Sequence, residues 1–240
     1  MTPAALADLV RSVAHDVLAS RGVDATALSA TVTVERPRDP EHGDYATNVA
    51  LQAGSKAGVP PRELAHWLAQ ELAQRRGVHS AEVAGPGFLN LRLAPDAKGE
   101  TVKQVLATGK RFGALQGLPT PRLAALEELP TVQYAHARLA ALARHAADLR
   151  ISCEDVQLEL LDHPHEVDLI GMLGEFPRIV AAAVDLHESR ALVHYLEQLT
   201  AAYHRFDTSC RVLPMGDEQD EPSDPRHVAR LALCRATRQV

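Results

Sequence analysis

The sequence predicts an α+β N-terminal domain, in which a small sheet is covered by helices, followed by an all-α helical bundle. Up to about residue 112, segments with helical spacing of apolar residues alternate with short strand-like runs. From residue 131 to the C-terminus, only helical spacing recurs. The intervening segment is rich in glycine and proline, which is typical of a linker. We therefore expect a domain over 1–112, a linker over 113–130 and a second domain over 131–240.

The first domain is expected to contain helices and short strands in alternation. Helical spacing begins near residue 3 and stops before Gly22, while Pro61 stands where the first turn of a helix favours proline. The turn Gly85-Pro86-Gly87 separates two strand-like runs. The predicted elements are a helix over 3–20, a strand over 31–34, helices over 44–57 and 61–76, strands over 81–84 and 88–93, and a helix over 95–108.

The second domain is expected to be entirely helical. Pro164 and Pro177 occupy positions typical of first helical turns, and Glu166 is placed to complete a helix cap. An apolar stripe that includes Leu199, Tyr203 and Phe206 predicts that Tyr203 lies in the core before it serves any RNA contact. The predicted helices cover 131–149, 154–161, 164–175, 177–186, 188–209 and 225–239, and an exposed acidic loop covers 215–225.

Composition and charge exclude several classes of protein. A hydrophobic content of 46% and a charged content of 23% are ordinary for a globular chain. No run of apolar residues is long enough to span a membrane, and three scattered cysteines without a CxxC pair favour the cytoplasm. Residues 1–130 hold 14 basic and 14 acidic side chains, whereas residues 131–240 hold 11 and 17. An indiscriminate nucleic-acid binder is usually basic, so the charge leaves room only for selective RNA contacts.

One strand face carries the sharpest candidate site. Strand periodicity places Phe88, Asn90 and Arg92 on one face of the run 88–93 and three leucines on the other. An aromatic ring, an amide and a guanidinium in a row can stack an unpaired RNA base and read its edge. The alternative is that Phe88 packs under a neighbouring helix and Asn90 bonds backbone near the turn.

A second candidate lies on the first helix of the bundle. At 100° per residue, Tyr134, Arg138 and His145 fall within about 40° of one another beside the apolar stripe. A tyrosine one turn before an arginine can stack a base and clamp its phosphate, although the same face can equally be a surface that binds nothing. His136 lies on the opposite shoulder, so we expect it to be a structural hydrogen-bonding residue.

Metal and nucleotide chemistry have weak support in the sequence. His163 and His165 have no neighbouring ligands that complete a plausible metal set, and a helix entry is the better interpretation. No phosphate-binding glycine motif follows a strand. We therefore expect no metal, cofactor, catalytic residue or small-molecule substrate.

Several motifs resemble bacterial arginyl-tRNA synthetase. Three N-terminal motifs resemble its additional domain: Val34-Glu35-Arg36-Pro37, Gly43-Asp44-Tyr45-Ala46-Thr47-Asn48 and Gly85-Pro86-Gly87-Phe88-Leu89-Asn90. The motifs after residue 131 resemble its helical anticodon-binding (DALR) domain: Val132-Gln133-Tyr134-Ala135-His136-Ala137-Arg138, the block 203–213 and the block 229–238. The HxGH and KMSKS-like elements of the synthetase's catalytic domain have no counterpart.

The resemblance implies a tRNA-binding protein without aminoacylation activity. In that family, the aromatic residue and asparagine matching Phe88 and Asn90 contact the tRNA D-loop, and motifs matching Tyr134, Arg138 and Arg211 belong to the anticodon-binding domain. The family commonly has tyrosine where Asp207 stands, and an acid there repels phosphate. Family chains also continue past Val240, so the stop there either removes an RNA-contacting tail or reflects a shortened chain.

Three functional hypotheses follow from these observations. The first is a non-catalytic protein that binds tRNA, with arginine tRNA favoured, and that delivers, sequesters or presents it to a tRNA-using enzyme. The second is a protein-interaction scaffold that has lost RNA affinity, which the acidic second half favours. The third is an accessory subunit of a split arginyl-tRNA synthetase.

Overall fold

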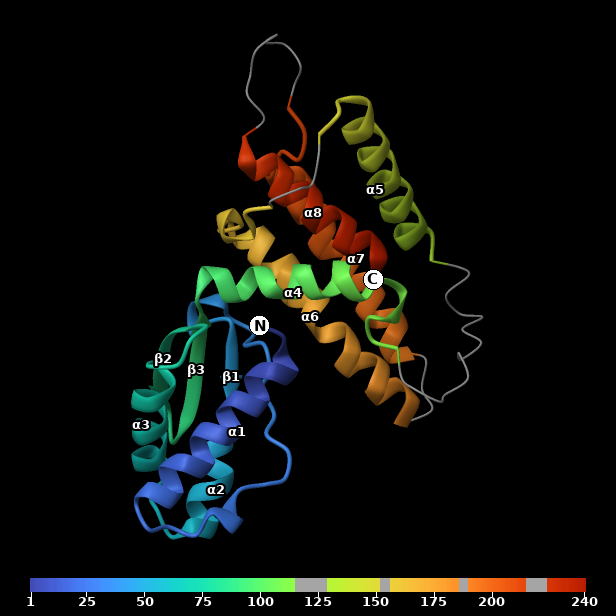
Figure 1. The fold of residues 1–240 in the computed structure, drawn as a ribbon. Helices are drawn as coiled ribbons and strands as arrows, with labels where there is room; N and C mark the ends of the chain where they lie inside the picture. The colour runs from blue at the N-terminus through green and yellow to red at the C-terminus, as the bar shows by residue number, and fades with distance from the viewer. Residues whose placement is uncertain (115–128, 152–155, 186–189, 215–223) are drawn as a thin grey trace. The chain divides into compact units, whose positions relative to one another are not determined.

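The computed structural model describes residues 1–114, 129–151, 156–185, 190–214 and 224–240 (Figure 1). It divides into two compact units, Met1–Ala97 and Lys98–Val240. Residues 98–112, expected to close the first domain, belong to the second unit. Each unit has its own hydrophobic core.

The first unit contains a small antiparallel sheet with the strand order β1-β3-β2. Leucines of the central strand share a core with helices α1, α2 and α3, which confirms a sheet covered by helices. The elements in chain order are α1 Pro3–Ser20, 3-10 turns Ala25–Ala27 and Pro40–His42, β1 Tyr45–Thr47, α2 Val49–Ala57, α3 Pro61–Leu72, β2 Val78–Ala84 and β3 Phe88–Leu93.

Two element predictions in this unit are wrong. Residues 31–34 form no strand; instead Glu35 makes an isolated antiparallel bridge with Ala46. The segment 44–57 is not one helix, because β1 occupies its start and pairs with β3, with Tyr45 opposite Leu91. Pairing with a strand distant in the sequence overrides local helical spacing here. Helix α3 also ends at Leu72, short of the predicted Arg76.

Strand β3 shows the alternation that its sequence predicts. Leu89, Leu91 and Leu93 are buried, whereas Phe88 and Arg92 are exposed and Asn90 is half-buried. The three polar or aromatic side chains therefore lie on the face away from the core. The strand is pinned on both sides, by β1 and by β2.

The second unit is helical, as predicted for a bundle. The elements are α4 Pro95–Thr108, which begins just inside the first unit, 3-10 turns Gly109–Arg111 and Leu158–Leu160, α5 Pro130–Asp148, α6 Pro164–Asp185, α7 Arg190–Ser209 and α8 Pro225–Gln239. Of the helix predicted over 154–161, the described residues form only the 3-10 turn Leu158–Leu160. The acidic loop predicted over 215–225 lies almost wholly outside the described residues, and so does Cys153.

Helix α6 corrects the prediction of separate helices over 164–175 and 177–186. Pro177 lies inside one continuous helix, although proline offers no N–H for the helical ladder. Leu169 and Leu173 before the proline are buried in the bundle core, and Ile179 after it is partly buried and packs against the same core. Packing on both sides holds the helix together across the break in its hydrogen bonds.

The start of α6 is fastened to α8 by a buried ion pair. Nε of Arg230 lies 2.6 Å from Oε1 of Glu166, whose side chain is 1% exposed. The second carboxylate oxygen of Glu166 accepts a hydrogen bond from the His163 N–H at 3.0 Å, which confirms the predicted cap. Arg230 also donates to the backbone carbonyl of Arg211 at 2.9 Å. One carboxylate therefore caps one helix and anchors another.

Helix α7 crosses the centre of the bundle core. Tyr203 and Phe206 are fully buried, so the prediction that Tyr203 is a core residue is confirmed. Burial raises the pKa of Tyr203, yet its hydroxyl has no hydrogen-bond partner among the described residues. Tyr195, two turns earlier, donates from its hydroxyl to the Met172 carbonyl at 2.9 Å. The same helix thus carries one satisfied and one unsatisfied buried tyrosine.

Candidate nucleic-acid interface

Phe88 borders a pocket of about 270 Å³ in the first unit. Phe88, the first residue of β3, is 42% exposed, which makes it one of the exposed large apolar residues of the described chain. The lining residues come from the segment before β1, from β1 itself, from the entry to α2 and from the start of β3; they are Thr33, Glu35, Arg36, Pro37, Arg38, Ala46, Thr47, Asn48 and Phe88. An open apolar ring beside arginines and an amide is the composition expected of a site that stacks a base and contacts phosphate.

The turn before Phe88 fixes its position. Phe88 pairs with Ala84 of β2, and Gly85 and Gly87 both have positive φ, at 52° and 146°. A Cβ at Gly87 would approach the backbone of Pro61 to 3.1 Å. Only glycine lets this turn lie against the start of α3 while it presents the ring outward.

The predicted row of Phe88, Asn90 and Arg92 shares one sheet face but not one pocket. Arg92 donates a hydrogen bond from its guanidinium to the backbone carbonyl of Glu41. Neither Asn90 nor Arg92 lines the pocket at Phe88. The structure instead brings Arg36, Arg38 and Asn48 to that ring.

Sequence reasoning did not select these three pocket residues. Arg36 and Asn48 belong to motifs that resemble the synthetase, and this resemblance was the feature of the sequence that could have identified them as site residues. These residues are far from Phe88 in the sequence, and the pairing of β1 with β3 is what brings them close to it in space. Their proximity to Phe88 could therefore not be predicted from residue spacing.

The second candidate lies on α5 and faces α7. Tyr134 is 61% exposed, and its ring centroid lies 6.0 Å from that of His204 at a tilt of 31°. One turn further, Nε of Arg138 donates to Oδ2 of Asp207 at 2.5 Å. This hydrogen bond with the Asp207 carboxylate raises the pKa of Arg138. The predicted stacking tyrosine is thus available, whereas the predicted phosphate clamp is already engaged by an acid.

The remaining predicted contacts on this unit lie at the surface. His145 and Arg211 are exposed, and within the described residues neither side chain forms a hydrogen bond or ion pair with Tyr134 or Arg138. His136 is exposed and, among the described residues, forms no hydrogen bond, so the structural role expected for it lacks support; it lines a groove between α5 and α8.

Metal and membrane features can be assessed for the described part of the chain. In those residues, no group of three or more His, Cys, Asp or Glu side chains could hold a metal ion. His163 and His165 lie at the entry to α6, where the His165 N–H donates to Nδ1 of His163 at 3.2 Å. No described helix has the length and apolar character needed to cross a bilayer.

Comparison with known families identifies both units. Residues 4–93 match the arginyl tRNA synthetase N terminal domain, and residues 132–240 match the DALR anticodon binding domain. The chain therefore belongs among arginyl-tRNA synthetase-related proteins and carries both of these domains. Only residues 94–131 separate the two matches, which leaves no room between them for a catalytic domain. The fold class and the resemblance found in the sequence are both confirmed.

Proposed function

We propose that this protein is a non-catalytic tRNA-binding protein of the cytoplasm that favours arginine tRNA. The observation that carries the proposal is the exposed Phe88 ring at a pocket edged by Arg36 and Arg38. The presence of an anticodon-binding domain in the same chain supports tRNA as the partner. Because both matched domains are non-catalytic, the tRNA is bound here and used by another enzyme.

The Phe88 pocket suits a single unstacked nucleotide. Stacking of one base on an exposed aromatic ring contributes about 1–3 kcal/mol. The guanidinium of Arg38 has no ion-pair partner among the described residues, so it is available to a phosphate oxygen. A base flipped out of a tRNA loop provides both groups at once. We therefore assign the D-loop side of the tRNA to this pocket.

The Tyr134 face suits a weaker second contact. Tyr134 offers an exposed ring, but the Arg138 guanidinium must leave Asp207 before it can contact phosphate. Binding by the second unit therefore depends more on Tyr134 than on Arg138. This arrangement lets the protein hold the anticodon arm without strong affinity for RNA in general, in keeping with its net charge of −6.

A binding experiment tests the proposal. Fluorescence anisotropy at several salt concentrations would compare labelled arginine tRNA with a panel of other tRNAs. We expect preferential binding of arginine tRNA, weakened roughly 5- to 150-fold by Phe88→Ala, the range that corresponds to loss of one stacking contact. Phe88→Trp should retain affinity. Leu149→Ala, which removes another exposed apolar side chain, serves as the matched control.

Footprinting adds a positional readout. Phe88→Ala should remove protection of a D-loop nucleotide and leave protection of the anticodon arm, whereas Tyr134→Ala should do the reverse. Equal affinity for every tRNA, or no measurable affinity for any, contradicts the proposal.

A further inference from the structure

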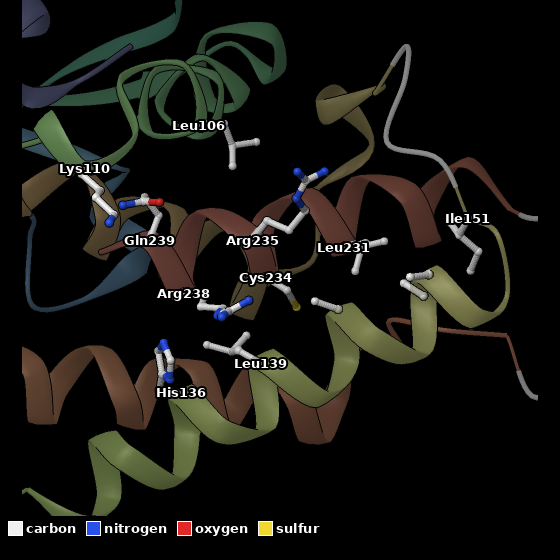
Figure 2. A pocket seen from close by; sticks show the side chains of 13 residues that line it. Leu106, Lys110, His136, Leu139, Ile151, Leu231, Cys234, Arg235, Arg238 and Gln239 are labelled. Carbon is white, nitrogen blue, oxygen red and sulfur yellow. The ribbon is translucent and has the colours of Figure 1, made fainter.

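A groove of about 750 Å³ lies in the second unit (Figure 2). Helix α5 forms one wall, α8 the other, and Leu106 and Lys110 close one side. The remaining lining residues are His136, Leu139, Ala143, Ala146, Ala147, Ile151, Leu231, Cys234, Arg235, Arg238 and Gln239. Neither proposed RNA contact, Phe88 or Tyr134, lines it.

The floor of the groove is apolar. Leu139 and Ala146 of α5 and Leu231 and Cys234 of α8 are core residues whose edges reach this surface. Leu106, a large aliphatic residue at the rim of the groove, is 38% exposed. Such a floor gains stability when another apolar surface covers it.

The charges at the rim all have one sign. Lys110, Arg235 and Arg238 line the groove, and no aspartate or glutamate is among the lining residues. Within the described chain, these three cations have no ion-pair partner, whereas Arg138, Arg178, Arg205, Arg226 and Arg230 of the same unit all pair with carboxylates. Three cations without ion-pair partners therefore border an apolar floor, which favours an occupant with both apolar and acidic groups.

The shape of the groove fits a helix. On α5 the lining residues His136, Leu139, Ala143 and Ala146 recur at intervals of three and four, the spacing of a helix–helix seam. The part of α5 that lines the groove, from His136 to Ala147, extends roughly 17 Å at 1.5 Å per residue, or about three helical turns. The alanines in this stripe leave space for large side chains of a neighbouring helix.

We propose that this groove binds an amphipathic helix of a partner protein, with its apolar stripe on the α5–α8 floor and its acidic side chains against Arg235, Arg238 and Lys110. RNA is the weaker match because the lining offers a single aromatic ring, the imidazole of His136, and because its aliphatic floor gains nothing from a phosphate backbone. The helix-in-groove mode uses the features present here: an apolar channel and charged edges.

A peptide selection tests this proposal. The probe is a displayed library of random peptides of about three helical turns, selected on the full-length protein and counter-selected on its Ala147→Trp variant. Ala147 is exposed and lines the groove, so a bulky ring there obstructs the channel without entering the core. We expect enriched peptides to be net acidic, with apolar residues at intervals of three and four.

Charge variants complete the test. The affinity of an enriched peptide should fall about tenfold in Arg235→Glu/Arg238→Glu, because two attractive rim contacts become repulsive. Arg144→Glu, an exposed change on α5 outside the lining, is the matched control and should have no effect. Phe88→Ala should also leave peptide binding intact, so this proposal and tRNA binding can fail independently.

Three outcomes would overturn the proposal. The first is enrichment of basic or uncharged peptides. The second is that no peptide remains enriched after counter-selection on the Ala147→Trp variant. The third is a loss of tRNA affinity in the rim-charge variant without any groove-dependent peptide, which assigns the groove to RNA instead.

Discussion

Arg138 on α5 and Asp207 on α7 form a direct ion pair with an Nε–Oδ2 distance of 2.5 Å. The Asp207 side chain is 14% exposed and that of Arg138 is 47% exposed, so the pair sits at the edge of the bundle. Asp207 therefore holds the one arginine on this face that sequence reasoning assigned to phosphate. Any RNA phosphate at this position competes with a carboxylate of the protein itself.

Release of that arginine should strengthen tRNA binding. In Asp207→Asn the Arg138 guanidinium loses its ionic partner, and we expect affinity to rise several-fold and the salt dependence to steepen by about one phosphate contact. Anisotropy titrations at several salt concentrations measure both. Asp168→Asn is the matched control, because it removes the same charge from the pair with Arg205. An unchanged salt slope in Asp207→Asn argues against RNA at this face.

The buried pair of Glu166 and Arg230 should dominate the stability of the second unit. Arg230→Ala leaves the Glu166 carboxylate buried without its cation, which we expect to lower the free energy of unfolding by about 3–5 kcal/mol. Urea unfolding monitored by circular dichroism gives the value. Arg226→Ala, also on α8, breaks an exposed pair with Asp162 and should cost about 1 kcal/mol or less. Similar losses in both variants contradict the assignment.

The two buried tyrosines of α7 should respond oppositely to loss of the hydroxyl. Tyr203→Phe removes an unsatisfied buried oxygen and should stabilise the protein by about 1 kcal/mol. Tyr195→Phe removes a hydrogen bond to Met172 and should destabilise it by about the same amount. Paired urea denaturations of the two variants measure the difference. A loss of stability in Tyr203→Phe means that its hydroxyl has a partner in solution.

Alkaline pH should destabilise the second unit through its cysteines. Burial, and then the nearby Glu166 carboxylate, raise the pKa of Cys210 from its ordinary value of 9.0 to about 11. Burial likewise raises the pKa of Cys234. Above pH 9 the unfolded thiols lose protons that the folded protein retains, so the contribution is complete below pH 9 and declines until about pH 11.

The Cys210 contribution is at most on the order of a few kcal/mol, given a pKa raised from 9.0 to about 11. Unfolding free energies measured across this pH range should fall less steeply in Cys210→Ala than in the wild type. Parallel pH profiles for the two proteins are the contrary result.

Local chemistry made much of the fold predictable from sequence. Six helices, α1, α3, α4, α5, α6 and α8, begin at prolines, which fix the backbone angle needed in a first turn and need no N–H partner there. The alternation along β3 was equally visible, because each side chain faces either core or solvent. The helical stripe that buries Tyr203 followed from spacing alone.

The errors share a non-local cause. Strand β1 exists because Tyr45 and Thr47 are paired with Leu91 and Leu89, more than forty positions away. Pro177 does not end α6 because side chains on both sides of it enter one core. Likewise, the partner of Arg138 lies on another helix, 69 residues further along the chain. Residue spacing cannot show which of two distant segments will meet.

Gly43 illustrates how far such dependence reaches. It is buried with φ at 104°, and a Cβ there would lie 2.8 Å from the Leu91 carbonyl oxygen. The adjacent Asp44 N–H bonds that same oxygen, and β1, which lines the Phe88 pocket, begins one residue later. During evolution Arg36 and Arg38 of the Phe88 pocket could be replaced one at a time, which would change the ligand that the pocket prefers. Position 43 does not tolerate such replacement, because any side chain there would meet the Leu91 carbonyl. The residues that bind the ligand can therefore vary only while a glycine without a binding role stays in place.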